Sequence, residues 1–309
     1  MIDHIKLLES YEIPSRRGYL RGLANRILRH DHTDPTTPSH IISINWAQRF
    51  LKRHPELHIT KAKPLAADRK RTHNPAVIRD WFFRLKDTIQ EFGILSDDIY
   101  NMDETGYQTG CGRSQMIVTT KPRSRIWLKD PENRQHITSI ECISATGYHL
   151  PSLIILTSSQ ILHNMIVPEL DPDTVLAVSD SGFSNDDISM ERIRHFNRHT
   201  KTRTKGAKRL LLLDSVNSHL EWDFIEYCWD ENIIPFAFIP HTTHLCQALD
   251  VKCFQLLKHY HSEAIDSAIR VGDSEFSRLE FLAAFQTFHQ QAFATSTILS
   301  AFRATGVVP

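Results

Sequence analysis

The sequence has 309 residues and a mass of 35.7 kDa, enough for one large domain or two smaller ones. Hydrophobic residues make up 41% and charged residues 23%, which is globular composition and excludes a wholly disordered chain. The formal net charge is zero, but residues 1–92 carry 17 Lys or Arg against 10 Asp or Glu, and the remainder carries 19 against 26. We therefore expect the N-terminal part to bind a polyanion and the remainder to bind cations.

The sequence also lacks features of membrane, secreted and disulfide-bonded proteins. No run approaches the ~18 apolar residues of a membrane helix, and the N-terminus lacks a basic-then-apolar leader, so we expect neither a membrane span nor a secretory signal. The five cysteines stand singly and never form a C-x-x-C pair. This predicts reduced intracellular thiols rather than disulfides or a cysteine zinc site.

The first 92 residues are predicted to be helical. Apolar residues three and four positions apart indicate amphipathic helices over 2–11, 18–30, 45–57 and 76–92. A loop is expected over 31–39, and the basic, proline-containing stretch 61–75 is typical of an extended cationic linker.

From about residue 99 the pattern changes to short β-rich runs. Strands are predicted over 99–103, 137–145, 150–156, 174–180, 209–214 and 233–239. Helices are predicted between and after the later strands, over 185–199, 218–231 and 251–265. Such an order favours an α/β domain with a mixed sheet flanked by helices, and the domain boundary is placed near 93–98.

Aspartates follow several predicted strands. Asp103, Asp180 and Asp214 each close a strand, and Asp250 opens an amphipathic helix after the last strand and a short loop. Carboxylates gathered at a sheet edge repel each other, and a bound divalent cation such as Mg²⁺ or Mn²⁺ removes that repulsion. Two local alternatives stay open: Asp103 as the start of a turn in DETG, and Asp250 as a helix N-cap.

Three blocks carry a family resemblance: NMDETGYQ (101–108), RLLLLDSVNSHL (209–220) and IPHTTHLCQALDVKCFQLLKHY (239–260). In this order they resemble the catalytic blocks of the DDE-superfamily endonuclease domain in pogo-type, mariner-like transposases. VSDSGFSND (178–186) and KTRTKGAKRLLLLD (201–214) resemble fungal members of that group. GYLRGLANRILRH (18–30) and NWAQRFLKRHPEL (45–57) resemble the centromere-protein-B-type helix-turn-helix.

The resemblance implies a ribonuclease-H-like mixed sheet flanked by helices, preceded by an all-α helix-turn-helix DNA-binding domain. The implied domains are the helix-turn-helix over 1–63, a basic linker and connecting helix over 64–98, and the endonuclease domain over 99–309, shortened at its C-terminal end. Asp103, Asp214 and Asp250 are the implied catalytic carboxylates of a DDD-type site that holds two Mg²⁺ or Mn²⁺ ions. His219 is an auxiliary candidate beside the metals.

Two departures from the family pattern lead to an alternative. Ser215 and Val216 stand where the family usually has Gly-His, and Ala248 replaces the proline of the usual Gln-Pro-Leu-Asp. The main hypothesis is a transposase-derived DNA-binding protein with a two-metal phosphodiester cleavage and strand-transfer domain. The alternative is a domesticated or decayed nuclear DNA-binding protein without catalysis.

The expected partner is double-stranded DNA, with a homodimer as the assembly to test, a nuclear location and no membrane. The candidate DNA-binding residues lie on the exposed face of the predicted helix 45–57 and in the linker that follows; they are Arg49, Lys52, Arg53, Lys61, Lys63, Arg69, Lys70 and Arg71. On the same helix, Trp46 and Phe50 are expected to pack in the core rather than to stack on bases.

Overall fold

The computed structural model describes residues 1–31 apart from 12, 14 and 16, residues 41–57 apart from 44, and residues 75–109, 135–214, 222–271 and 276–308. The chain divides into two compact units. The first unit combines Met1–Ile99 with Ser189–Thr243, and the second combines Tyr100–Ile188 with His244–Pro309. The predicted functional residues that lie outside the described ranges are Lys61, Lys63, Arg69, Lys70, Arg71 and His219. Ser215 and Val216, which depart from the family pattern, also lie outside them.

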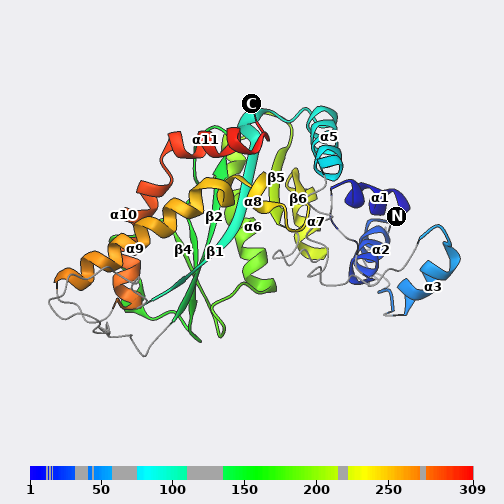
Figure 1. The fold of residues 1–309 in the computed structure, drawn as a ribbon. Coiled ribbons are helices and arrows are strands. Elements are labelled where there is room, and N and C mark those ends of the chain that lie inside the picture. Colours follow the sequence, from blue (N-terminus) through cyan, green and yellow to red (C-terminus); the bar gives the residue numbers. More distant parts are fainter. Residues whose placement is uncertain are drawn as a thin grey trace, which may run out of the picture. The chain divides into compact units, whose positions relative to one another are not determined.

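The N-terminal helices of the first unit lie close to their predicted positions (Figure 1). They are α1 (Ile2–Ser10), α2 (Arg17–Asp31), α3 (Trp46–Arg53) and α5 (Pro75–Glu91). The third helix is shorter than predicted, because it ends at Arg53 and His54 has the non-helical dihedrals φ −121° and ψ 79°. His54 precedes Pro55, and the ring of a proline disfavours helical dihedrals in the residue before it.

Two parallel strands, β5 (Arg209–Asp214) and β6 (Ile233–Phe238), form the sheet part of the first unit, with α7 (Trp222–Asp230) between them in the chain. Every residue of the two strands is buried except Asp214, which is half-buried. Near-continuous apolar runs of this kind are typical of parallel strands that are covered on both faces.

Trp81 attaches α5 to β6. Its indole Nε1 donates a hydrogen bond to the carbonyl oxygen of Ala237 at 2.9 Å, and its ring stacks on Phe238 with centroids 5.4 Å apart. The side chain is 1% exposed. On the same residue of β6, the backbone N–H of Ala237 donates to the carbonyl oxygen of Tyr11 at 2.9 Å. The N-terminal segment therefore hydrogen-bonds directly to this strand.

Helix α2 packs closely on α7. Gly22 lies against the indole of Trp222, where a Cβ atom would come within 2.3 Å of the ring. Tyr19 meets the same ring edge-on at 5.1 Å. Arg26 pairs with Asp230 at 2.6 Å and with Glu226 at 3.4 Å. This part of α2 is therefore a packing surface, and the charge of Arg26 is paired within the unit.

The second unit contributes four strands, β1 (Ile99–Gln108), β2 (His136–Ser144), β3 (Leu153–Thr157) and β4 (Val175–Ser179). β1 and β2 are antiparallel with Asp103 opposite Glu141, β2 and β3 are antiparallel, and β3 and β4 are parallel. Helix α6 (Asp186–Thr200) follows β4.

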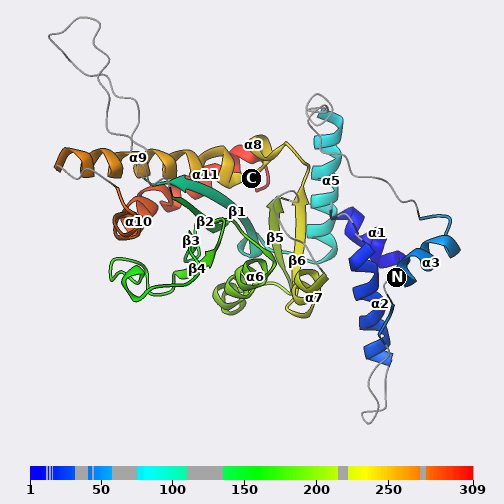
Figure 2. The same ribbon diagram turned by 90° about the horizontal axis from the view of Figure 1, so that it is seen from below.

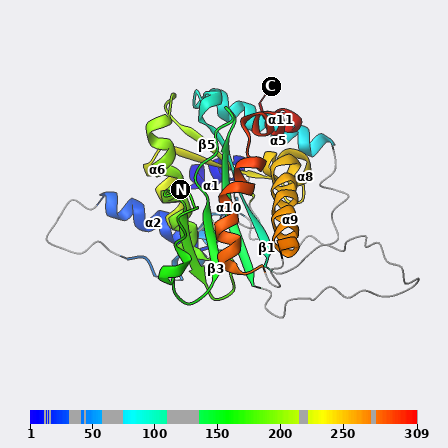
Figure 3. The same cartoon turned by 90° about the vertical axis from the view of Figure 1, so that its left-hand side faces the viewer.

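The C-terminal helices cover one face of this part of the sheet (Figures 2 and 3). They are the short α8 (Thr243–Cys246), a π-helical turn (Leu249–Cys253), α9 (Phe254–Val271), α10 (Arg278–Ala292) and α11 (Thr295–Thr305). Aromatic contacts connect the layers: the ring of Tyr107 on β1 lies 5.0 Å from His261 of α9 and 5.0 Å from Phe281 of α10.

The strand order is β4-β3-β2-β1-β5-β6, with antiparallel and parallel pairs. The predicted mixed sheet flanked by helices, preceded by a helical N-terminal region, is therefore confirmed.

Candidate functional site

Asp103 lies in the middle of a strand. The sequence predicts that this strand ends at Asp103, with a turn beginning there as the alternative. Both expectations are wrong, because β1 continues to Gln108. Buried Thr105 and Tyr107 alternate with exposed Gly106 and Gln108, which is the period of a half-covered strand. Asp103 is 8% exposed and belongs to the covered face.

The segment that carries Asp250 is hydrogen-bonded to β1. The amide Nε2 of Gln247 donates to Oδ2 of Asp103, and the backbone N–H of Leu249 donates to Oδ1 of Asn101 at 3.0 Å. These contacts join residues more than 140 positions apart in the chain. The second unit thus places the neighbours of Asp250 directly on the strand of Asp103.

Asp250 is not a helix N-cap, so that alternative is wrong. Ala248, in helical conformation, is the N-cap residue, and Asp250 lies inside the π-helical turn that leads into α9. Its side chain is half-buried. π-helical turns within α-helices are rare and occur frequently at functional sites.

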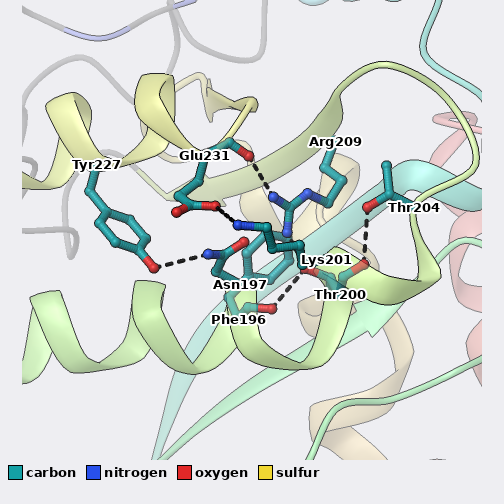
Figure 4. A network of polar contacts seen from close by, with 8 residues as sticks. All are labelled: Phe196, Asn197, Thr200, Lys201, Thr204, Arg209, Tyr227 and Glu231. Carbon is teal, nitrogen blue, oxygen red and sulfur yellow. Dashed lines mark hydrogen bonds and ion pairs between the residues drawn. The ribbon is translucent and has the colours of Figure 1, made fainter.

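Asp214 belongs to the first unit, where it is the last residue of β5, as predicted, and is half-buried. The strand is anchored at its other end by Arg209, which is 3% exposed (Figure 4). One guanidinium nitrogen donates to Oγ1 of Thr200 at 2.7 Å and another to the carbonyl oxygen of Glu231 at 2.5 Å. Lys201 pairs with the carboxylate of Glu231 at 2.7 Å. This network fixes the start of the strand whose end carries Asp214.

The donor chemistry suits a hard divalent cation. Carboxylate and amide oxygens are the ligands that Mg²⁺ and Mn²⁺ prefer. Gln247 is fully buried and its Oε1 has no hydrogen-bond partner among the described residues, so an acceptor oxygen remains beside Asp103. Within the described ranges, no three His, Cys, Asp or Glu side chains gather closely enough to hold a metal ion. The convergence of Asp103, Asp214 and Asp250 stays a prediction.

Two other acidic residues, Asp180 and Glu104, do not share the covered face of β1 with Asp103. Asp180 is exposed in the turn after β4. Glu104 follows Asp103 on β1 and therefore points to the opposite face of the strand.

The described basic candidates form one exposed surface. Arg49, Lys52 and Arg53 are all exposed on α3, as predicted. On the other side of this helix Phe50 is buried, which confirms its predicted core role. Trp46 is half-buried and stacks on Phe50 with centroids 5.0 Å apart, so it lies at the edge of the core.

Gln247 and Asn101, whose side chains make these contacts, are not among the residues predicted from the sequence. The sequence does contain a pattern that points to such contacts. Polar residues occupy positions 101, 103 and 105, which alternate along β1 and lie on its covered face, where the other residues are apolar. Polar groups on a covered face need hydrogen-bond partners, which predicts that another polar segment packs there. The pattern alone did not identify that segment.

Two family models match the chain. Residues 133–302 match the DDE superfamily endonuclease, and residues 1–63 match the Tc5 transposase DNA-binding domain. In the described part of the chain, no helix has the length and apolar character needed to cross a bilayer.

Similar proteins were also found. Over 232 residues the chain is 33% identical to a protein of Cochliobolus lunatus named MFS-type transporter clz9, covering 75% of this chain and 25% of that protein. The chain spans about a quarter of the length of the curated relatives it matches. Among solved structures, the Mos1 transposase paired-end complex with left transposon end has a TM-score of 0.42 at 11% identity, covering 91% of this chain and 79% of that chain. The mariner Mos1 paired end complex with Mg has a TM-score of 0.40 at 12% identity, covering 93% and 90%.

Proposed function

The chain belongs to the DDE superfamily endonuclease family, and from this premise we propose that it is a transposase-derived protein that binds double-stranded DNA and cleaves and rejoins its phosphodiester bonds. The observation that carries the proposal is the attachment of the segment of Asp250 to the strand of Asp103 through Gln247 and Leu249. Asp214, at the end of β5, would supply the remaining carboxylate, which is the second of the family pattern in chain order.

The proposed roles of the residues follow from their chemistry. Asp103, Asp214 and Asp250 would hold two Mg²⁺ or Mn²⁺ ions, with His219 as an auxiliary candidate. Such ions, when bound, activate an attacking hydroxyl and stabilise the leaving oxygen of an in-line displacement at phosphorus. Gln247 restricts the orientation of the Asp103 carboxylate through its hydrogen bond to Oδ2. The contact of Leu249 with Asn101 restricts the start of the π-helical turn relative to β1.

Residues 1–63, which match a transposase DNA-binding domain, would deliver DNA to these carboxylates. The exposed charges of α3 and the linker residues Lys61, Lys63, Arg69, Lys70 and Arg71 would neutralise phosphates. A nuclear location and a homodimer complete the proposal.

A nicking assay on supercoiled DNA, with and without Mg²⁺ or Mn²⁺, tests the catalytic part. The expected result is cation-dependent nicking by the unaltered protein and none by Asp214→Ala. Absence of nicking by both proteins, with DNA binding retained, would instead support the non-catalytic DNA-binding protein.

Neutralising the basic surface of α3 is expected to weaken DNA binding. Each lost phosphate contact lowers the slope of log K against log salt by about 0.9, so Arg49→Gln, Lys52→Gln and Arg53→Gln together should make it less steep by about 3. Fluorescence anisotropy with a labelled duplex at several salt concentrations measures both affinity and slope.

The matched control removes three exposed charges outside the helix-turn-helix region: Arg194→Gln, Arg198→Gln and Lys258→Gln. It should bind DNA with nearly the salt slope of the unaltered protein. Equal losses in the two triple variants would mean that net charge, rather than α3, determines binding.

A further inference from the structure

A second acidic side chain lies opposite Asp103 in the sheet. In the antiparallel pairing of β1 and β2, the Cα partner of Asp103 is Glu141. Side chains of directly opposed residues project from the same face, with Cβ atoms about 4.5–5.5 Å apart. The observed contacts also place both side chains on one face of the sheet. Asp103 is hydrogen-bonded to Gln247, which precedes α9, and Glu141 is hydrogen-bonded to His289 of α10. Both helices cover this face (Figure 3).

Two donors hold one oxygen of Glu141. The hydroxyl of Ser152 donates to Oε2 at 2.8 Å, and Nε2 of His289 lies 2.9 Å from the same oxygen. Ser152 Oγ and His289 Nε2 are 3.1 Å apart, so the three groups form a closed cluster. The exposed fractions of Glu141, Ser152 and His289 are 1%, 3% and 2%. A carboxylate buried this deeply is costly, and its retention beside Asp103 requires a reason.

The other oxygen of Glu141 has no hydrogen-bond partner in the part of the chain that the structure describes. Oε1 is buried and unpartnered among the described residues, as is Oε1 of Gln247. The amide of Gln247 is already placed at Asp103 by the hydrogen bond from its Nε2. Among the described residues, two buried acceptor oxygens without donors thus belong to Glu141 and Gln247, which both neighbour Asp103. Unpaired buried acceptors cost free energy, and a cation or the water bound to it would satisfy them.

We propose that Glu141 is part of the divalent-cation site of Asp103, to which it adds a second negative charge and the acceptor oxygen Oε1. This inference rests on the proposed function, since it takes Asp103 as a metal-binding carboxylate. Ser152 and His289 orient Glu141 by holding its Oε2. The role of Glu141 is therefore to attract and position the cation, whereas a purely structural Glu141 would only connect β2 to α10.

Binding of Mn²⁺, measured by electron paramagnetic resonance of free Mn²⁺ and by calorimetry, tests the proposal without an activity readout. Glu141→Gln keeps the shape of the side chain and removes its charge. We expect it to weaken Mn²⁺ binding by about 10–100-fold, the range found when groups supporting a metal site are altered. Glu104→Gln is the matched control, because it removes the same charge one residue from Asp103 but on the opposite face of β1. It should change the dissociation constant less than about threefold, as expected of a more distant and screened charge.

A thermal-unfolding series without metal separates a binding effect from a structural one. Ser152→Ala removes a hydrogen bond from the cluster while leaving the charge of Glu141, so it should lower Tm but retain most of the Mn²⁺ affinity. If Glu141→Gln lowers Tm while binding Mn²⁺ like the unaltered protein, Glu141 is structural and the inference is wrong. Asp103→Asn tests the premise that Asp103 binds the cation. If this variant binds Mn²⁺ like the unaltered protein, or if the unaltered protein binds no Mn²⁺, both the inference about Glu141 and the proposed metal-dependent function are wrong.

Discussion

Replacing Asp103 by asparagine is expected to lower the rate of cation-dependent DNA nicking at least about a thousandfold, the equivalent of some 4 kcal/mol of transition-state stabilisation. Asparagine has nearly the same shape and can still accept the hydrogen bond from Gln247, so the fold should persist. The variant lacks the negative charge that holds the cation. Single-turnover nicking of supercoiled DNA at saturating protein gives the rate of the chemical step.

Glu104→Gln serves as the control for this rate measurement as well, since Glu104 neighbours Asp103 on β1 but points to the other face. It should nick DNA within a fewfold of the unaltered rate. Circular dichroism and DNA affinity should match for all three proteins. If Asp103→Asn nicks at an undiminished rate, the cleaving group is elsewhere or the activity comes from a contaminating nuclease.

Trp81→Ala is expected to have the largest effect on stability, lowering the free energy of unfolding by about 3–5 kcal/mol. The indole is 1% exposed, stacks on Phe238 and donates to the carbonyl oxygen of Ala237. Alanine would leave a cavity between α5 and β6 and an acceptor without its donor. Urea unfolding followed by far-ultraviolet circular dichroism measures the change, with the m-value as a check of two-state behaviour.

Two variants show whether burial causes the loss. Phe83→Ala removes an aromatic ring from the same helix at a position that is 59% exposed, and it should cost less than about 1 kcal/mol. Trp81→Phe keeps an aromatic ring but removes the hydrogen bond, so its stability should lie between those of the unaltered protein and Trp81→Ala. Equal losses for Phe83→Ala and Trp81→Ala would contradict the proposed attachment of α5 to β6.

Much of the fold was predictable because its signals are local. Apolar spacing located the helices α1, α2 and α5, and apolar runs located β5 and β6 within a residue or two. The error at β1 has a physical cause: DETG has turn composition, but the pairing of Glu104, Thr105 and Gly106 with β2 keeps the chain extended. Tertiary pairing thus overrides a local preference.

The candidate site was predictable only in part. The family resemblance predicts Asp103, Asp214 and Asp250 as the catalytic carboxylates, and of this prediction the structure shows that the segment of Asp250 is hydrogen-bonded to the strand of Asp103. The roles of Gln247 and Glu141 depend on hydrogen bonds and strand register between distant segments. Neither residue has a local pattern that separates it from an ordinary polar side chain, so a single sequence could not reveal them.

The hydrogen bond from Ala237 to Tyr11 has a practical consequence for dissecting this protein. β6 is the outermost strand of the sheet order, and all its residues are buried. An apolar outer strand with bare backbone groups is a template for aggregation. A shortened protein that begins after the helix-turn-helix would lose Tyr11 and leave that strand open, so insolubility of such a fragment would reflect an uncovered sheet edge rather than a defective nuclease fold.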